Sequence, residues 1–175
     1  MRFFSSIRLM LLGIWLGAAC FFIVVAQSAF ALSPTREVAG SLVNRTLAVL
    51  NIGGLAIGVL LIVLSLVGTK YSAKFWIWTE RFLLLIVAGA CAVGQFVISQ
   101  WLMYVRLQMG KPIDEIAADD PLRIQFNSLH EYSVWALMVA MIAAAVAFFI
   151  ISNRKFGSVT AKTTDDTTLQ NDFKI

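Results

Sequence analysis

The sequence predicts an all-α integral membrane protein, a four-transmembrane-helix bundle with a short interfacial helix and a disordered C-terminal tail. The chain has 175 residues, of which 59% are hydrophobic and 14% are charged, and its mean hydropathy is +0.82. A soluble domain of this size cannot bury so much apolar surface. No segment alternates apolar and polar residues as a barrel strand does, so helices must satisfy the backbone in lipid.

Four apolar runs are long enough to cross about 30 Å of hydrocarbon as helices. They lie at about residues 9–32, 46–68, 82–105 and 132–152. With their connections they form one predicted domain, residues 1–156, followed by a polar, Thr-rich cytoplasmic tail at 157–175. Basic residues precede the first run and an A-x-A pattern ends it, so a cleaved signal peptide is the alternative for this segment.

Small or polar residues recur at spacings of three and four in each run, which places them on one face of each helix. The first run has Gly13, Gly17 and Cys20, the second Asn51, Gly54, Gly58 and Ser65, the third Ala88, Cys91, Ala92, Gln95 and Ser99, and the fourth Ala136, Ala140, Ala144 and Ala147. Helices in lipid associate through such faces. The pattern predicts close packing, within the chain or with neighbouring membrane proteins.

The connections carry helix signals of their own. A short interfacial helix is expected in the first connection, residues 33–45. The longest connection, residues 107–129, holds Asp120 and Pro121, which predict an N-cap and the first residue of the fourth helix. With four spans, the termini and the 69–80 loop share one side, which has nine basic residues against five on the other. The positive-inside rule then places both termini in the cytoplasm.

The polar residues within the spans are distributed unevenly. The half nearer the termini has essentially Ser65, whereas the middle and the opposite half hold most of the others. A polar pocket that opens on the side away from the termini would explain this, and its candidate residues are Gln27, Asn51, Gln95, Ser99, His130 and Ser133. The alternative is that helix ends are wet and that a few amides join helices by hydrogen bonds.

His130 is the only histidine of the chain and precedes Glu131. At 100° per residue, His130 borders the alanine face of the fourth helix and Glu131 points away from it, so the two do not form a working pair. We expect His130 to face the bundle and to bond residues 33–45 or a neighbouring helix. Any cofactor, such as haem or a pigment, would use His130 as its axial ligand, but the sequence requires no cofactor.

No catalytic or metal-binding motif stands out in the sequence. H-E-x-x-H, G-x-S-x-G, P-loop and Rossmann fingerprints are absent, so no catalytic residue and no enzymatic activity are predicted. Cys20 and Cys91 lie inside apolar runs without a C-x-x-C pattern, and no His/Met/Cys cluster has metal-ligand spacing. The basic residues are dispersed at helix ends, which does not indicate nucleic-acid binding.

Four parts of the sequence form a recognisable pattern: "GIWLGAACFF" (residues 13–22), Phe30, "REVAG" (residues 36–40) and "DPLRIQFNSLHEYS" (residues 120–133). Together they resemble the transmembrane protein 205-like family of four-helix membrane proteins. The family usually has Ala-Pro near the end of the first helix, whereas Gln27 follows Ala26 in this chain. The resemblance implies the four-helix architecture and a bacterial membrane protein of unknown function. It supplies no catalytic residue.

Three functions are compatible with these sequence features. The first is a non-enzymatic accessory or structural subunit of the bacterial cytoplasmic (inner) membrane, whose partners are the lipid bilayer and other membrane proteins or further copies of itself. The second is a binder or transporter of a small molecule or ion that uses the polar pocket. The third is a membrane subunit that binds a pigment or haem through His130.

Overall fold

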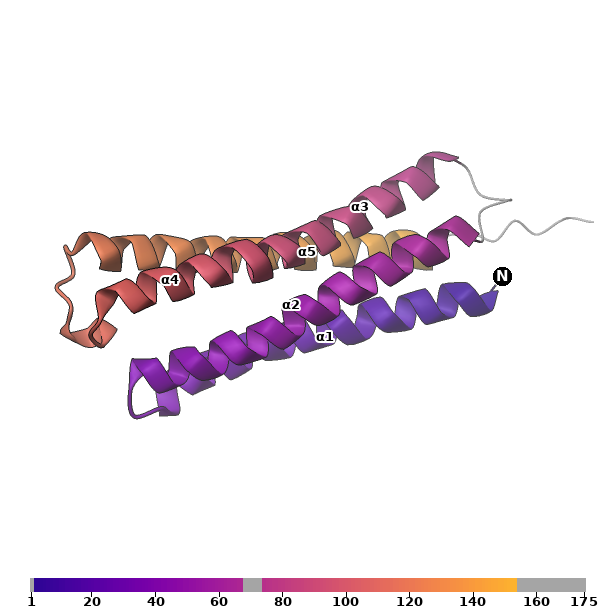
Figure 1. Ribbon diagram of the computed structural model, residues 1–175. Coiled ribbons are helices and arrows are strands. Elements are labelled where there is room, and N and C mark those ends of the chain that lie inside the picture. Colours follow the sequence, from indigo (N-terminus) through magenta and orange to yellow (C-terminus); the bar gives the residue numbers. More distant parts are fainter. Residues whose placement is uncertain (1, 68–73, 154–175) are drawn as a thin grey trace, which may run out of the picture.

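Four long helices run up and down in the computed structural model, which describes residues 2–67 and 74–153 (Figure 1). They are α1 (Arg2–Leu32), α2 (Arg36–Val67), the continuous run of α3 (Lys74–Ala92), η1 (Val93–Ile98) and α4 (Ser99–Met109), and α5 (Pro121–Ser152), with the 3-10 turn η2 (Ile113–Glu115) before α5. All four are long and apolar enough to cross a membrane, so the predicted all-α membrane bundle is confirmed. The predicted disordered tail, residues 157–175, lies outside the described residues.

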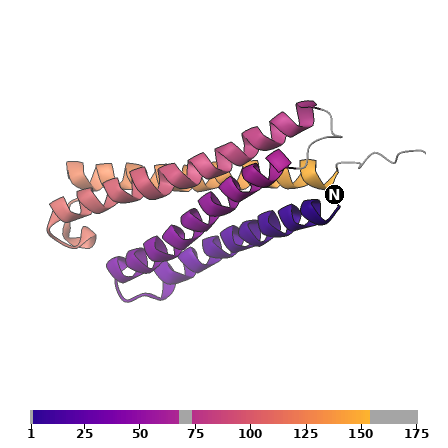
Figure 2. The same cartoon turned by 45° about the vertical axis from the view of Figure 1, so that its right-hand side comes forward.

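The bundle has two distinct ends. The α1–α2 turn and the α4–α5 connection lie at one end, here called the connection end, and the start of α1 and the end of α5 lie at the other, the terminal end (Figure 1). Figure 2 shows the same arrangement from a second direction. Helix α2 packs between α1 and α3, and α5 packs against both α1 and α3.

Local sequence explains where two of the helices begin. The Asp120 side chain accepts a hydrogen bond from the Leu122 backbone N–H at 2.8 Å, and Pro121 is the first helical residue, as predicted. The Thr35 hydroxyl accepts a hydrogen bond of 3.3 Å from a backbone N–H in the first turn of α2. Helix α2 then continues without a break. Residues 36–45, for which the sequence predicts a short separate helix, are therefore the first turns of α2.

The third span changes geometry near its middle. Val93–Ile98 form a π-helix, η1, in which each backbone N–H bonds the carbonyl five residues earlier and each turn takes up about one extra residue. Before η1, α3 packs against α2 and α5; after it, α4 packs mainly against α5. The π-helix therefore lies where the third span leaves α2.

The apolar interior is divided into two clusters. The larger joins α1, α2, α3 and α5 around the fully buried side chains of Leu12, Leu61 and Leu84. The smaller joins α4 and the start of α5 around Val105 and Leu129. At the connection end, α4 and α5 thus share a core that is separate from the contacts of α1 with α2.

Small side chains bring three helices close together in the middle of the bundle. An added Cβ at Gly54 of α2 would lie 2.6 Å from Cys91 Sγ on α3 and 2.6 Å from Trp15 Nε1 on α1. The Trp15 indole N–H donates to the Leu50 carbonyl oxygen at 3.0 Å. A larger residue than glycine would push these helices apart, so Gly54 sets their separation.

Candidate functional site

Polar and small residues recur every seven positions along α2. The set is Glu37, Asn44, Asn51, Gly58 and Ser65. Seven residues are nearly two helical turns, so these positions share one face with a drift of about 20° per step. Each of them contacts a residue of the third span, in order Arg106, Ser99, Gly94, Ala88 and Arg81. We call this row of contacts the α2 seam.

The connection-end part of the α2 seam is polar and partly exposed. Glu37 forms an ion pair with Arg106, and the Ser99 hydroxyl donates to Asn44 Oδ1 at 3.3 Å. Arg36, beside Glu37, forms a second ion pair with Asp114 at 3.4 Å. The side chains of this second pair are 65% and 51% exposed. An exposed ion pair of this kind stabilises the fold by only about 0–1 kcal/mol. These bonds connect α2 to α4 where the apolar packing between the two helices has ended.

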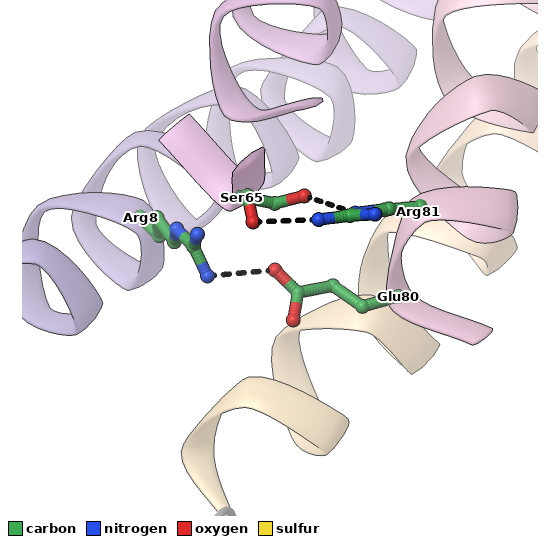
Figure 3. Close-up of polar contacts among 4 residues, drawn as sticks. All are labelled: Arg8, Ser65, Glu80 and Arg81. Atoms are coloured by element: carbon green, nitrogen blue, oxygen red, sulfur yellow. Dashed lines mark hydrogen bonds and ion pairs between the residues drawn. The ribbon is translucent and has the colours of Figure 1, made fainter. Parts of the chain in front are cut away.

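The terminal end of the seam holds a buried charge cluster (Figure 3). Arg8 Nη1 of α1 lies 2.9 Å from Glu80 Oε1 of α3, and the two side chains are only 8% and 1% exposed. The neighbouring Arg81 donates from Nε to the Ser65 hydroxyl at 2.8 Å and from Nη2 to the Ser65 carbonyl oxygen at 2.9 Å. The cluster therefore joins α1, α2 and α3 at one level of the bundle.

Burial makes the Arg8–Glu80 pair energetically consequential. Removing two charges from water is costly, and their attraction offsets that cost only when both partners are present. Loss of one partner leaves an uncompensated charge and costs about 3–5 kcal/mol in proteins generally. Ionisable residues that face the interior of a membrane bundle are candidates for function by default. In this protein the cluster can fix the positions of three helices within the bundle.

Three of the six predicted pocket residues belong to the α2 seam or adjoin it. Asn51 is buried, and its Nδ2 would lie 3.1 Å from a Cβ added at Gly94 of η1. Gln95 follows Gly94, and its Oε1 is buried without a hydrogen-bond partner among the described residues. Ser99 bonds Asn44, as described above. Asn51 of α2 and Gln95 of the π-helix therefore each place a polar side chain in the middle of the bundle.

The remaining three predicted pocket residues do not join this group. Ser133 is buried on α5, whereas Gln27 and His130 are exposed. The His130 side chain forms no hydrogen bond with residues 33–45 or with any other residue that the structure describes, so the expected contact is wrong. The buried row of α5 passes through Leu129 and Ser133, and His130 is turned by about 100° from Leu129. The half-buried Ala136, on which the expected helix phase depended, lies at the edge of this row.

Two open hollows lie between α1 and α2 rather than along the α2 seam. Their volumes are about 490 and 340 Å³, and they adjoin each other because Phe21 and Val25 line both. None of the six predicted pocket residues lines either hollow. The lining is mostly aliphatic and aromatic, with Ser28 and Ser33 near the connection end and Thr46 farther in. We call the two adjoining hollows together the α1–α2 groove.

Sequence reasoning missed the charge cluster because it counted Arg8 and Arg81 as positive-inside charges at the membrane surface. The available signal was Glu80, the one acidic residue near the terminal end in residues 2–67 and 74–153, set between Trp78 and a long apolar run. No group of three or more His, Cys, Asp or Glu side chains that could hold a metal ion occurs within those same ranges. The chemistry that these residues offer is ion pairing and hydrogen bonding.

Comparison with known proteins identifies a family but no activity. No curated protein and no solved structure matches this chain. Residues 10–111, from the first helix through the end of the third span, match a family described as a domain of unknown function, DUF4149. This agrees with the expected membrane family of unknown function, while the transmembrane protein 205-like name stays a prediction. Because the match covers more than half of the chain, the protein belongs to the DUF4149 family.

Proposed function

We propose that this chain is a non-enzymatic membrane protein that packs against another membrane protein, as an accessory or structural subunit, through one face of α1. The observation that carries this proposal is an amide, Gln27, on a face of α1 that is exposed in the described chain from Gly17 onward. The Gln27 side chain is exposed and makes no hydrogen bond within the described residues.

The same face of α1 continues toward the terminal end. Gly17, Cys20 and Val24 are exposed, and a Cβ added at Gly17 would meet no atom within 4 Å. Only Gly13, the first residue of this face, approaches α5, where its added Cβ would lie 3.7 Å from Phe148. The small-residue spacing that predicts helix packing is therefore used inside the chain at Gly13, whereas Gly17 and Cys20 are exposed.

An uncovered amide and an uncovered glycine face favour a partner helix. A polar group without a hydrogen bond costs about 2–7 kcal/mol in an apolar environment, depending on the reference state. Small residues allow close approach of a second helix, whose polar groups can bond the amide. A partner membrane protein supplies both the close contact and the hydrogen bond.

Blue-native electrophoresis after mild solubilisation tests this proposal. The wild-type protein should migrate as a complex larger than the monomer with its detergent, and Gly17→Leu should shift it to the monomer. Gly89→Leu is the matched control, because Gly89 of α3 is also exposed with no atom within 4 Å of its added Cβ. A wild-type species no larger than the monomer would argue against the proposal.

A second candidate function, binding of a small polar molecule or ion, is supported by the buried Oε1 of Gln95, which has no hydrogen-bond partner among the described residues. A buried acceptor without a partner is uncommon in folded proteins, and π-helices often occur at functional sites. A ligand that donates a hydrogen bond would satisfy this atom. Rescue of every uptake or resistance phenotype of a deletion strain by Gln95→Leu would refute this candidate. The third candidate, pigment or haem binding, gains no support from the exposed His130.

We further propose that the protein lies in the cytoplasmic membrane of a bacterium with both termini in the cytoplasm. The support is the excess of basic residues, nine against five, on the side of the termini. Fusions of alkaline phosphatase, which is active only outside the cytoplasm, test the orientation. A fusion after Asn153 should be inactive and one within residues 110–120 active; the reverse pattern would overturn the assignment.

A further inference from the structure

We infer that the α1–α2 groove holds an acyl chain of an anionic phospholipid whose phosphate pairs with Arg45. The groove lies between α1 and α2 and adjoins the face of α1 proposed for a partner protein, since Val24 belongs to both. It combines two observations: an apolar groove open to the membrane, and a guanidinium beside it that has no counter-ion in the described protein.

The position of Arg45 is unusual for a basic residue. It is exposed on α2 between Leu42 and Val49, one turn away on either side, and both of these are exposed as well. Arg36, which is paired with Asp114, lies about 13 Å farther toward the connection end. Arg45 therefore lies within an apolar belt rather than among the charged residues at the end of the helix.

Arg45 has no protein partner at this position. The Arg45 side chain forms no hydrogen bond or ion pair with any residue in the part of the chain that the structure describes. An unpaired guanidinium at the lipid surface of a span must reach the headgroups or pair with an anion. Phosphate suits it best, because its oxygens accept two parallel hydrogen bonds from the planar group.

The groove runs from the α1–α2 turn, at Ser33 and Pro34, past the position of Arg45 on α2. Leu42, Thr46 and Val49, which adjoin Arg45 in the sequence or lie one turn away, line it, and it continues to Ile57. The distance along α2 from Leu42 to Ile57 is about 22 Å, more than one leaflet of hydrocarbon, which is about 15 Å thick. Its dimensions and apolar lining suit an extended acyl chain.

The charge beside the groove selects the headgroup. A zwitterionic phospholipid brings its own ammonium group, which competes with Arg45 for the phosphate. A headgroup with net negative charge leaves the phosphate free for the guanidinium. Because the structure describes no acidic partner for Arg45, an anionic lipid neutralises the site where a zwitterionic lipid does not.

Native mass spectrometry of the purified full-length protein tests the site. The protein is incubated with phosphatidylglycerol or phosphatidylcholine of identical acyl chains, and retained lipids are counted for the monomer. Wild type should retain one more phosphatidylglycerol than phosphatidylcholine. Arg45→Gln should weaken that retention about tenfold, as expected for loss of a charge-assisted pair, and Arg45→Lys should weaken it less.

A second variant tests the groove while leaving Arg45 intact. Gly53 lines the groove, and a Cβ added there would meet no atom within 4 Å, so Gly53→Leu should fill the groove without disturbing the helices. It should displace the lipid, whereas the control Gly89→Leu should not. Unchanged retention in Arg45→Gln, unchanged retention in Gly53→Leu, or equal retention of both lipids would each overturn the inference. A dimer that dissociates in Arg45→Gln would instead assign the groove to a second copy and would also overturn it.

Discussion

Arg8 of α1 and Glu80 of α3 form an ion pair of 2.9 Å although 72 positions separate them in the sequence. Both side chains are buried, at the level where Arg81 bonds Ser65 of α2. One carboxylate thus fixes the start of the first span against the start of the third.

Removal of either partner of the Arg8–Glu80 pair should destabilise the protein strongly. Arg8→Met or Glu80→Gln should each lower the free energy of unfolding by about 3–5 kcal/mol, because the remaining charge stays buried without its partner. The double variant Arg8→Met/Glu80→Met should lose less than the sum of the two single losses. Unfolding in mixed micelles with increasing sodium dodecyl sulfate measures all three, and strict additivity would contradict the pairing.

Ser65→Ala tests the second half of the charge cluster. The substitution removes the hydroxyl that accepts from Arg81 Nε but keeps the carbonyl that accepts from Nη2. The expected loss is about 1–3 kcal/mol, because a charged donor loses a buried acceptor. Ser128→Ala is the control, since that hydroxyl bonds only the carbonyl of Ile124 on its own exposed turn. Equal thermal stability of the two variants would mean that the Arg81 contact contributes little.

Adjacent glycines of α2 should respond in opposite directions to alanine. Gly54→Ala places a Cβ 2.6 Å from Cys91 Sγ and from Trp15 Nε1, so it should destabilise the fold by about 1–3 kcal/mol. Gly53→Ala meets no atom within 4 Å and should be neutral or stabilise by up to about 1 kcal/mol, because alanine favours the helix. Thermal unfolding in detergent measures both, and a Gly54→Ala variant as stable as wild type would refute the close contact.

Gln95→Leu distinguishes an empty polar site from an occupied one. If Oε1 is unpaired in the membrane, its replacement removes a desolvation cost and should stabilise the purified protein by about 1–3 kcal/mol. If a ligand or water bonds Oε1, the variant should be less stable and should lose its response to that ligand. Gln108→Leu serves as control, because Gln108 is exposed near the end of α4.

The sequence predicts features that depend on composition and local geometry. The number of spans follows from the apolar runs, and the start of α5 follows from Asp120 and Pro121 because a cap is a local interaction. The placement of Gly54 and Cys91 on the packing faces of their helices follows from small-residue spacing. These features require no knowledge of which helix lies beside which.

Features that depend on helix pairing could not be predicted in the same way. Arg8 and Glu80 each look like surface charges until α1 and α3 are placed together. The phase of the alanines alone predicts that His130 faces the bundle. The buried row of α5 instead passes through Leu129 and Ser133, next to His130. Rotations of a few tens of degrees decide such cases, and sequence periodicity does not resolve them.

The π-helix takes up one extra residue of the third span, and this decides which side chains of α4 face α2. One additional residue in a turn rotates everything that follows by about 100° compared with an uninterrupted α-helix. Arg106 meets Glu37, and Ser99 meets Asn44, only with that rotation in place. If the same number of residues adopted ordinary α-helical geometry throughout, the Arg106 guanidinium would turn by about 100° away from the Glu37 carboxylate. A one-residue deletion within Val93–Ile98 would instead remove the extra residue together with the π-turn and leave Arg106 facing Glu37. The π-helix therefore accommodates one residue of the third span without changing which later side chains face α2.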